Sequence, residues 1–136
     1  MNESSADTRS MFFERDIPYP PEKIWRALTQ PHLIEQWLMK NDFQAAVGHK
    51  FELRGEWGNV DCQVREVEQN RTLSYTWEAF GVESVVSWTL TPTDSGTLLR
   101  VEQSGFRMDQ QQAYQGAQYG WQRFFRNLER VLRRMT

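Results

Sequence analysis

Between residues 43 and 103 the chain alternates apolar with polar side chains, and short turn signals divide this stretch into segments. A period of two residues is typical of strands that bury one face. Strands joined by short turns pair antiparallel, so the pattern predicts a meander whose one apolar face needs a single cover. The turn signals stand at residues 58–59, 68–71, 81 and 93–96.

The cover is predicted at the end of the chain, where "AYQGAQYGWQRFFRNLERVLRRM" (113–135) has the period of an amphipathic helix. Asp109 and Gln112 resemble a capping box at its start. One stripe of this helix carries small side chains in its first two turns and large ones afterwards. Its members are Ala113, Ala117, Gly120, Phe124, Leu128 and Val131, with Gly116 and Trp121 at its margins.

Two of these small residues are Gly116 and Gly120, although an interior glycine costs a helix about 1 kcal/mol relative to alanine. Close approach of the sheet to the helix would explain them. A pocket under the first half of the helix, walled by aromatic side chains of the sheet, would explain them as well. Both alternatives stay open, because a glycine can touch one strand while a cavity opens beside it.

The segment before the meander predicts one strand and two short helices. The strand spans 11–17, and Pro21 and Pro31 suit the first turns of helices in "EKIWRALT" and "QPHLIEQWLM". Residues 1–10 are polar and are predicted to form a disordered tail. Residues 11–136 are then expected to fold as one domain.

Composition excludes several classes of protein. A net charge of −2 gives no electrostatic case for nucleic acid or for an anionic membrane. No apolar run approaches the roughly 18 residues that a membrane span needs, and the first residues lack the apolar core of a signal peptide. The single Cys62 cannot form an internal disulfide. We therefore expect a cytoplasmic protein.

Four motifs, in this order, resemble the SRPBCC (START-like, helix-grip) superfamily. They are "ERDIPYPPEKIWRALTQPHLIEQWL", "QVREVEQNRTLSYTW", "VVSWTLTPTDSGTLLRVEQSGF" and "GWQRFFRNLERVL". The sequence looks most like the branch named for the C-terminal domain of the activator of heat-shock protein 90 ATPase. The resemblance extends over residues 11–134.

The resemblance implies an α+β helix-grip fold: a curved antiparallel sheet of about six strands wrapped around a long C-terminal helix, with two short helices after the first strand. Members of the superfamily commonly enclose a cavity for hydrophobic molecules, some cyclise polyketides, and the namesake stimulates a chaperone. The family's frequent histidine before "SGF" is Gln103 here, which strand parity turns inward. Phe125 replaces the first leucine of the closing motif.

Few side chains offer catalytic chemistry. His32 is expected in solvent and His49 near the rim of a pocket, and no spacing in the sequence is typical of a metal site or a phosphate loop. Cys62 is predicted to be a packed thiol, and Glu83 a solvated carboxylate. Arg15 is expected on the inner face of the sheet, between Phe13 and Ile17. A buried arginine needs a partner, so it is predicted to pair with an acidic side chain inside the sheet, with the anchoring of a ligand carboxylate as the alternative. We assign no catalytic residue, metal ligand or cofactor.

Aromatic side chains supply the candidate binding site. Trp77 and Trp88 are assigned to the core, whereas other aromatic residues are expected to gather where the short helices, a hairpin and the start of the last helix meet. With a few polar groups these would suit a flat, mostly apolar small molecule. The predicted ligand-binding residues are Trp37, Trp57, Tyr75, Gln103, Phe106, Tyr114, Gln118 and Trp121.

Three functions compete at this point. The leading hypothesis is a non-catalytic binding protein for a hydrophobic or aromatic small molecule. The second, from the resemblance, is a module associated with a chaperone. The third is an enzyme of the cyclase or hydrolase type that uses the same cavity, and the absence of a histidine at Gln103 counts against it. Nucleic acid is not expected as a partner, since Glu129 interrupts the arginine face of the last helix.

Overall fold

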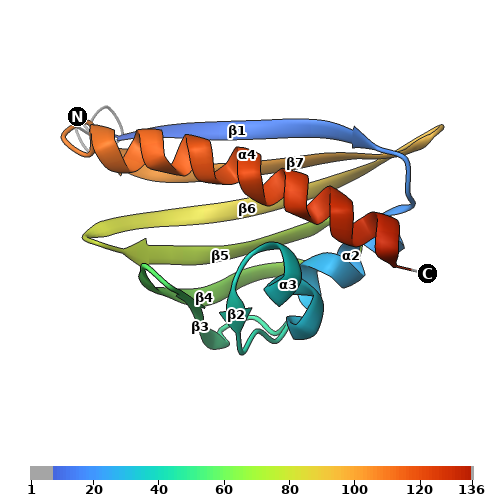
Figure 1. Ribbon diagram of the computed structural model, residues 1–136, viewed down its shortest axis with the longest axis horizontal. Helices are drawn as coiled ribbons and strands as arrows, with labels where there is room; N and C mark the ends of the chain where they lie inside the picture. The colour runs from blue at the N-terminus through green and yellow to red at the C-terminus, as the bar shows by residue number, and fades with distance from the viewer. Residues whose placement is uncertain (1–7, 136) are drawn as a thin grey trace.

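A long helix lies across one face of a curved antiparallel sheet in the computed structural model, which describes residues 8–135 (Figure 1). The sheet has seven strands in the order β1-β7-β6-β5-β4-β3-β2. The strands are β1 (Thr8–Ile17), β2 (Lys40–Asn41), β3 (Lys50–Gly55), β4 (Gly58–Glu68), β5 (Thr72–Ala79), β6 (Val82–Thr93) and β7 (Gly96–Arg107). The helices are α2 (Pro21–Thr29), α3 (Pro31–Trp37) and α4 (Gln111–Arg134).

The predicted α+β helix-grip fold is confirmed, including the two short helices after the first strand. The sheet has one strand more than the predicted six or so, because the two residues of β2 pair with β3 at the edge. The strand β1 begins at Thr8, so residues 8–10 pair with β7 instead of belonging to the expected tail. The rest of that tail, residues 1–7, lies outside the described residues.

Two hairpin tips lie next to each other at one end of the sheet. Gly55 pairs with Gly58, so the β3–β4 turn consists of Glu56 and Trp57, and the turn predicted at 58–59 is wrong by two residues. The β5–β6 turn consists of Phe80 and Gly81, both with positive φ (54° and 79°), as a two-residue hairpin of type I′ requires. The rings of Trp57 and Phe80 are 5.6 Å apart between centroids.

The strand β7 carries a bulge at Gly105. The register with β1 shifts there, since Arg9 pairs with Phe106 and Ser10 with Ser104. Gly105 has φ +109°, and a Cβ at this position would lie 2.8 Å from the backbone oxygen of Glu83. A glycine is therefore needed both for the backbone conformation and for the close approach of β6.

The second half of α4 provides the cover that the meander needs. Phe125, Leu128, Val131 and Leu132 are buried, and the helix packs against α2, α3, β1 and β7. The predicted stripe is wrong at one large position, because Phe125 enters the core whereas Phe124 is only partly buried.

The predicted capping box at the start of α4 is also wrong. The residue before the helix is Gln110, and its side chain does not cap the helix. It accepts a hydrogen bond from the backbone N–H of Arg107 (2.9 Å) and donates one to the backbone oxygen of Gly81 (3.1 Å). Asp109 forms an ion pair with Arg107 instead of turning toward the helix (3.2 Å).

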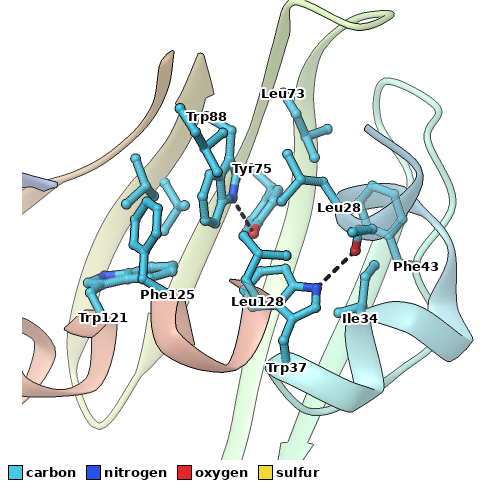
Figure 2. Close-up of a cluster of buried hydrophobic side chains, with 14 of the residues drawn as sticks. Leu28, Ile34, Trp37, Phe43, Leu73, Tyr75, Trp88, Trp121, Phe125 and Leu128 are labelled. Atoms are coloured by element: carbon cyan, nitrogen blue, oxygen red, sulfur yellow. Dashed lines mark hydrogen bonds between the residues drawn. The ribbon is translucent and has the colours of Figure 1, made fainter. Parts of the chain in front are cut away.

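The core lies between the sheet, the second half of α4 and the two short helices. Trp88 stands at its centre, with its ring edge-on to Trp37 at 5.6 Å (Figure 2). The indole N–H of Trp88 donates to the Tyr75 hydroxyl (3.0 Å), and that of Trp37 to the backbone oxygen of Ala27 (2.9 Å). The assignment of Trp88 to the core is confirmed. Each buried indole N–H thus has a partner, which avoids the cost of an unpaired polar group.

Candidate ligand-binding site

A cavity of about 1170 Å³ lies between the first half of α4 and the sheet. The helix wall consists mainly of small residues: Ala113, Gly116, Ala117 and Gly120. The sheet contributes side chains of β5, β6 and β7, and the far wall comes from β2, β3 and the β3–β4 turn.

The two helix glycines have open space beside them, and Gly116 is exposed whereas Gly120 is partly buried. A Cβ built on Gly116 would meet no atom within 4 Å, and one on Gly120 would meet only the ring of Phe124, at 3.7 Å. Close approach of the sheet is therefore the wrong explanation for both glycines. Their missing side chains contribute to the cavity, which both residues line.

Aromatic rings form much of the remaining wall. Trp77 and Trp121 are 5.7 Å apart between ring centroids, and Phe106 lies nearby on β7. At the rim, the hairpin-tip residues Trp57 and Phe80 are 53% and 77% exposed. The cavity therefore has a covered aromatic interior and an aromatic mouth that is open to solvent, as is typical of sites for small apolar molecules.

The interior also contains a chain of hydrogen bonds centred on Gln103, which is 3% exposed. The indole N–H of Trp121 donates to Gln103 Oε1 (2.7 Å), and Gln103 Nε2 donates to Ser84 Oγ (2.9 Å). Ser84 in turn donates to the backbone oxygen of Trp77 (2.9 Å). These bonds fix both walls of the cavity, because Trp121 belongs to α4 and Gln103 to β7.

Charged residues are also among those that line the cavity. They are Lys40 and Arg54, from β2 and β3, Arg123 of α4, and Glu56, the one carboxylate among the lining residues. Lys40 and Arg54 are direct cross-strand partners, and they alternate along their strands with the buried Met39 and Leu53, so their side chains point toward the outer face of the sheet. The polar amide of Asn127 lines the cavity from α4.

The structure brings together half of the predicted ligand-binding residues. Those that line the cavity are Trp57, Gln103, Phe106 and Trp121. Tyr114 and Gln118 lie on the same half of α4 but outside the cavity wall. Tyr114 packs edge-on against Phe106 at 5.3 Å and donates its hydroxyl to the backbone oxygen of Ser10 (3.0 Å).

Trp37 and Tyr75 belong to the core and not to the cavity wall (Figure 2). Both are buried, and their polar atoms bond inside the core. Burial raises the pKa of Tyr75, which keeps its hydroxyl neutral. Strand parity put Tyr75 on the correct face, but parity cannot tell whether α4 or empty space covers a given position on that face.

Several lining residues were missed. Trp77 was assigned to the core, yet it is half-buried and lines the cavity, because it lies opposite the small residues of α4. Phe80 was not considered, although a bulky aromatic in a hairpin turn that favours glycine and asparagine is an unusual choice. The other missed residues are Leu38, Met39, Lys40, Arg54, Gly55, Glu56, Ala79, Val82, Tyr119, Arg123, Phe124 and Asn127.

The side chains with catalytic potential lie elsewhere. Cys62 is buried, and burial together with nearby carboxylates raises the pKa of its thiol, so the prediction of a packed thiol is confirmed. Glu83 is exposed, as predicted. His49 bonds the backbone oxygen of Asp42 (2.9 Å) and stacks on Phe51, away from the cavity wall.

Arg15 has an acidic partner, Glu129 at 3.1 Å, but this partner belongs to α4, so the expected pair of a buried arginine with a carboxylate inside the sheet is wrong. The pair joins β1 to the helix and is partly exposed on both sides. Arg15 thus ties the helix to the edge of the sheet, and it does not line the cavity.

Within residues 8–135 no group of three or more histidine, cysteine, aspartate or glutamate side chains could hold a metal ion. Over the same residues, no helix is long and apolar enough to cross a membrane.

The family model described as "Activator of Hsp90 ATPase homolog 1-like protein" matches residues 18–133. The chain belongs to this family. None of the curated proteins matches this sequence.

Solved structures of the same fold include close and distant relatives. Protein MLL2253 from Mesorhizobium loti is 58% identical, with a TM-score of 0.91 over 94% of this chain and 99% of that one. BH1534 from Bacillus halodurans is 26% identical, with a TM-score of 0.81 over 91% and 96% of the two chains. DynU16, described as a putative protein of the dynemicin biosynthetic locus, is 27% identical, with a TM-score of 0.80 over 94% of this chain and 48% of its own.

Proposed function

We propose that this member of the family binds a hydrophobic or aromatic small molecule, without chemical change, in the cavity under the first half of α4. The open space at Gly116, an exposed residue that lines the cavity where it opens to solvent, carries the proposal, because the helix accepts the cost of an interior glycine where no neighbouring atom requires one. Selection for packing or helix stability would favour alanine or a larger residue at that position. A binding site gives the missing side chain a function.

The composition of the wall supports the same proposal. Aromatic rings surround the interior, and Gln103 offers a buried amide whose bonds to Trp121 and Ser84 hold it in one orientation. Sites for small molecules commonly combine apolar walls with a few fixed polar groups. The volume of about 1170 Å³ admits a molecule of several fused or linked rings.

An enzyme that uses the same cavity is the weaker alternative. A cyclase or hydrolase needs an acid and a base that share an enclosed site. Among the residues that line the cavity, the one carboxylate is Glu56 in an exposed turn, and there is no histidine or cysteine. DynU16 is described as a putative protein of a biosynthetic locus. By analogy, this chain could carry an intermediate between biosynthetic enzymes without catalysing a step itself.

The chaperone-associated function rests on the family description alone. Measuring the ATPase rate of a chaperone of the Hsp90 class in excess protein tests it, and an unchanged rate removes it. If a variant whose cavity is filled by a larger side chain still stimulates the ATPase, the function belongs to the surface of the protein and not to the cavity.

A displacement screen tests the binding proposal. N-phenyl-1-naphthylamine, a neutral dye whose fluorescence rises in apolar surroundings, serves as the reporter, and a library of lipids and aromatic metabolites competes for the site. We expect dye binding at one site per chain and displacement by a small group of chemically related compounds, each visible by native mass spectrometry as a 1:1 complex. A protein that binds neither the dye nor any library compound would refute the proposal.

A further inference from the structure

Three tryptophans line the cavity, and their indole N–H groups differ in their partners. The N–H of Trp121 donates to Gln103 Oε1 at 2.7 Å. Trp57 and Trp77 line the cavity as well, but neither indole N–H donates a hydrogen bond to any group of residues 8–135. An indole nitrogen can only donate, so an acceptor for these two groups has to come from water or from a ligand.

The N–H of Trp77 belongs to the covered part of the cavity. Trp77 shares its parity along β5 with the buried Leu73 and Tyr75, so its side chain points toward the inner face of the sheet. It is half-buried, and its ring is 5.7 Å from that of Trp121 on α4 between centroids. Among residues 8–135, the fully buried side-chain nitrogen without a partner is Arg9 Nε, so the Trp77 N–H is not sealed among packed atoms. The open space beside it is that of the cavity, which the residue lines.

The polar side chains beside Trp77 already bond to other groups. Ser84 is its direct cross-strand partner, and Ser84 Oγ accepts from Gln103 Nε2 (2.9 Å) and donates to the backbone oxygen of Trp77 (2.9 Å). Gln103 Oε1 holds the N–H of Trp121. Because these side chains are uncharged, they would not replace the hydration that a charged ligand group loses. The wall at Trp77 thus offers one donor in neutral surroundings.

Trp57 presents a contrasting N–H at the mouth of the cavity. A Cβ on Gly55 would lie 3.0 Å from Trp57 Nε1 and 3.2 Å from Met39 Sδ. Gly55 shares its parity along β3 with the buried Leu53, so the indole of Trp57 also lies on the inner face of the sheet. Trp57 is 53% exposed, however, so water can still reach its N–H when a ligand is bound. This residue is therefore an internal comparison for Trp77.

On the basis of the proposed function, we propose that Trp77 selects the ligand by donating its N–H to an acceptor oxygen, and that the ligand is a neutral aromatic ketone or quinone. The rings of Phe106 and Trp121 would receive the aromatic body. A ligand that lies against Trp77 excludes water from the N–H, and the donor stays unpaired unless the ligand supplies an acceptor. A hydrocarbon of the same shape incurs this cost, so the site discriminates against it.

Two tricyclic compounds that differ at one carbon test this inference. 9-Fluorenone has the planar ring system of fluorene, with a carbonyl group in place of its methylene group, and each compound competes with N-phenyl-1-naphthylamine for the cavity. We expect fluorenone to bind about fivefold more tightly than fluorene, in line with one hydrogen bond to an otherwise unpaired donor. Fluorene is the more hydrophobic of the two, so burial of apolar area alone predicts the reverse order.

Variants locate the donor. Trp77→Phe keeps an aromatic ring but removes the N–H, so it should bind the two compounds with nearly equal affinity. The matched control is Trp57→Phe, which removes the N–H at the exposed mouth and should retain the preference for fluorenone. Thermal unfolding shows whether both variants fold.

The carbonyl stretching band of fluorenone bound to the unchanged protein is a readout that needs no variant. A hydrogen bond from Trp77 should lower its frequency relative to fluorenone in a hydrocarbon solvent, and Trp77→Phe should remove this shift.

The outcomes separate this inference from the proposed function. Equal affinity of the unchanged protein for both compounds, or a carbonyl band at its hydrocarbon position, would overturn the selection and leave a cavity for apolar molecules. A preference that Trp77→Phe retains, or that Trp57→Phe loses equally, would overturn the assignment to Trp77. Dye that neither compound displaces would also overturn the inference, while the proposed function stands. A protein that binds neither the dye nor any library compound would refute both.

Discussion

The indole N–H of Trp121 donates to the side-chain oxygen of Gln103 at 2.7 Å, and this bond joins α4 to β7 at the inner end of the cavity. Both residues are almost fully buried. Gln103 therefore has a structural function in addition to its place in the candidate site.

Replacing Gln103 with leucine should destabilise the protein by about 1–3 kcal/mol, because the Trp121 N–H loses its buried partner. Urea unfolding followed by tryptophan fluorescence measures the change. The control is Gln122→Leu on the exposed side of α4, which should change stability little. A Gln103→Leu variant as stable as the unchanged protein would show that the bond to Trp121 contributes nothing.

Replacing Gly116 with alanine should stabilise the protein by about 0.5–1 kcal/mol. A Cβ there meets no atom within 4 Å, so the helix gains the propensity of alanine without a clash. Thermal unfolding measures the gain, and Gln115→Ala at an exposed neighbouring position is the control for a surface change that removes no glycine. A loss of stability in Gly116→Ala would mean that the sheet approaches the helix closely after all.

Replacing Gly105 with alanine should cost more than replacing Gly81. Both glycines have positive φ, which costs an L-residue about 1–2 kcal/mol. At Gly81 the added Cβ would meet nothing within 4 Å, whereas at Gly105 it would meet the Glu83 oxygen at 2.8 Å. Comparing the free energies of unfolding of the two variants measures the added cost of the contact. Equal losses would contradict the argument from close approach.

The fold was largely predictable because its signals are local. The alternation of apolar and polar side chains and the turn residues define the strands. The helical period of the apolar residues in α4 identifies the helix that covers the sheet. The capping box failed because Asp109 pairs with Arg107, a contact that the helix signal does not contain. The hairpin turn was misplaced because Gly58 begins β4 instead of forming the turn.

The cavity was less predictable, because its walls depend on how far α4 stands from each strand. Parity placed Gln103 and Tyr75 on the inner face, but only Gln103 lies beneath the small residues of the helix. Trp77 was assigned to the core for the same reason, because the sequence does not tell how far α4 lies from the strand that carries it.

The stability of the protein should fall as the pH rises above about 9. The pKa values of Cys62 and Tyr75 are raised in the folded state, mainly by burial, from ordinary values of 9.0 and 10.0. The unfolded chain then binds fewer protons than the folded one at alkaline pH, so the free energy of unfolding declines by up to about 1.4 kcal/mol per pH unit for each group.

Urea unfolding at pH 8, 9, 10 and 10.5 measures this decline. The variant Cys62→Ala removes one of the two groups and should show a shallower decline between pH 9 and 10, whatever its stability at neutral pH. Identical slopes for this variant and the unchanged protein would show that the thiol ionises as readily in the folded state as in the unfolded one.

The most direct test of the cavity as a binding site is the affinity of N-phenyl-1-naphthylamine for Gly116→Trp, measured beside Gly116→Ala and the unchanged protein. The indole of the tryptophan variant would occupy the open space at Gly116, so we predict a folded protein whose affinity for the dye is about tenfold lower or worse. Gly116→Ala should bind the dye nearly as well as the unchanged protein. A folded Gly116→Trp variant with undiminished affinity would contradict the account.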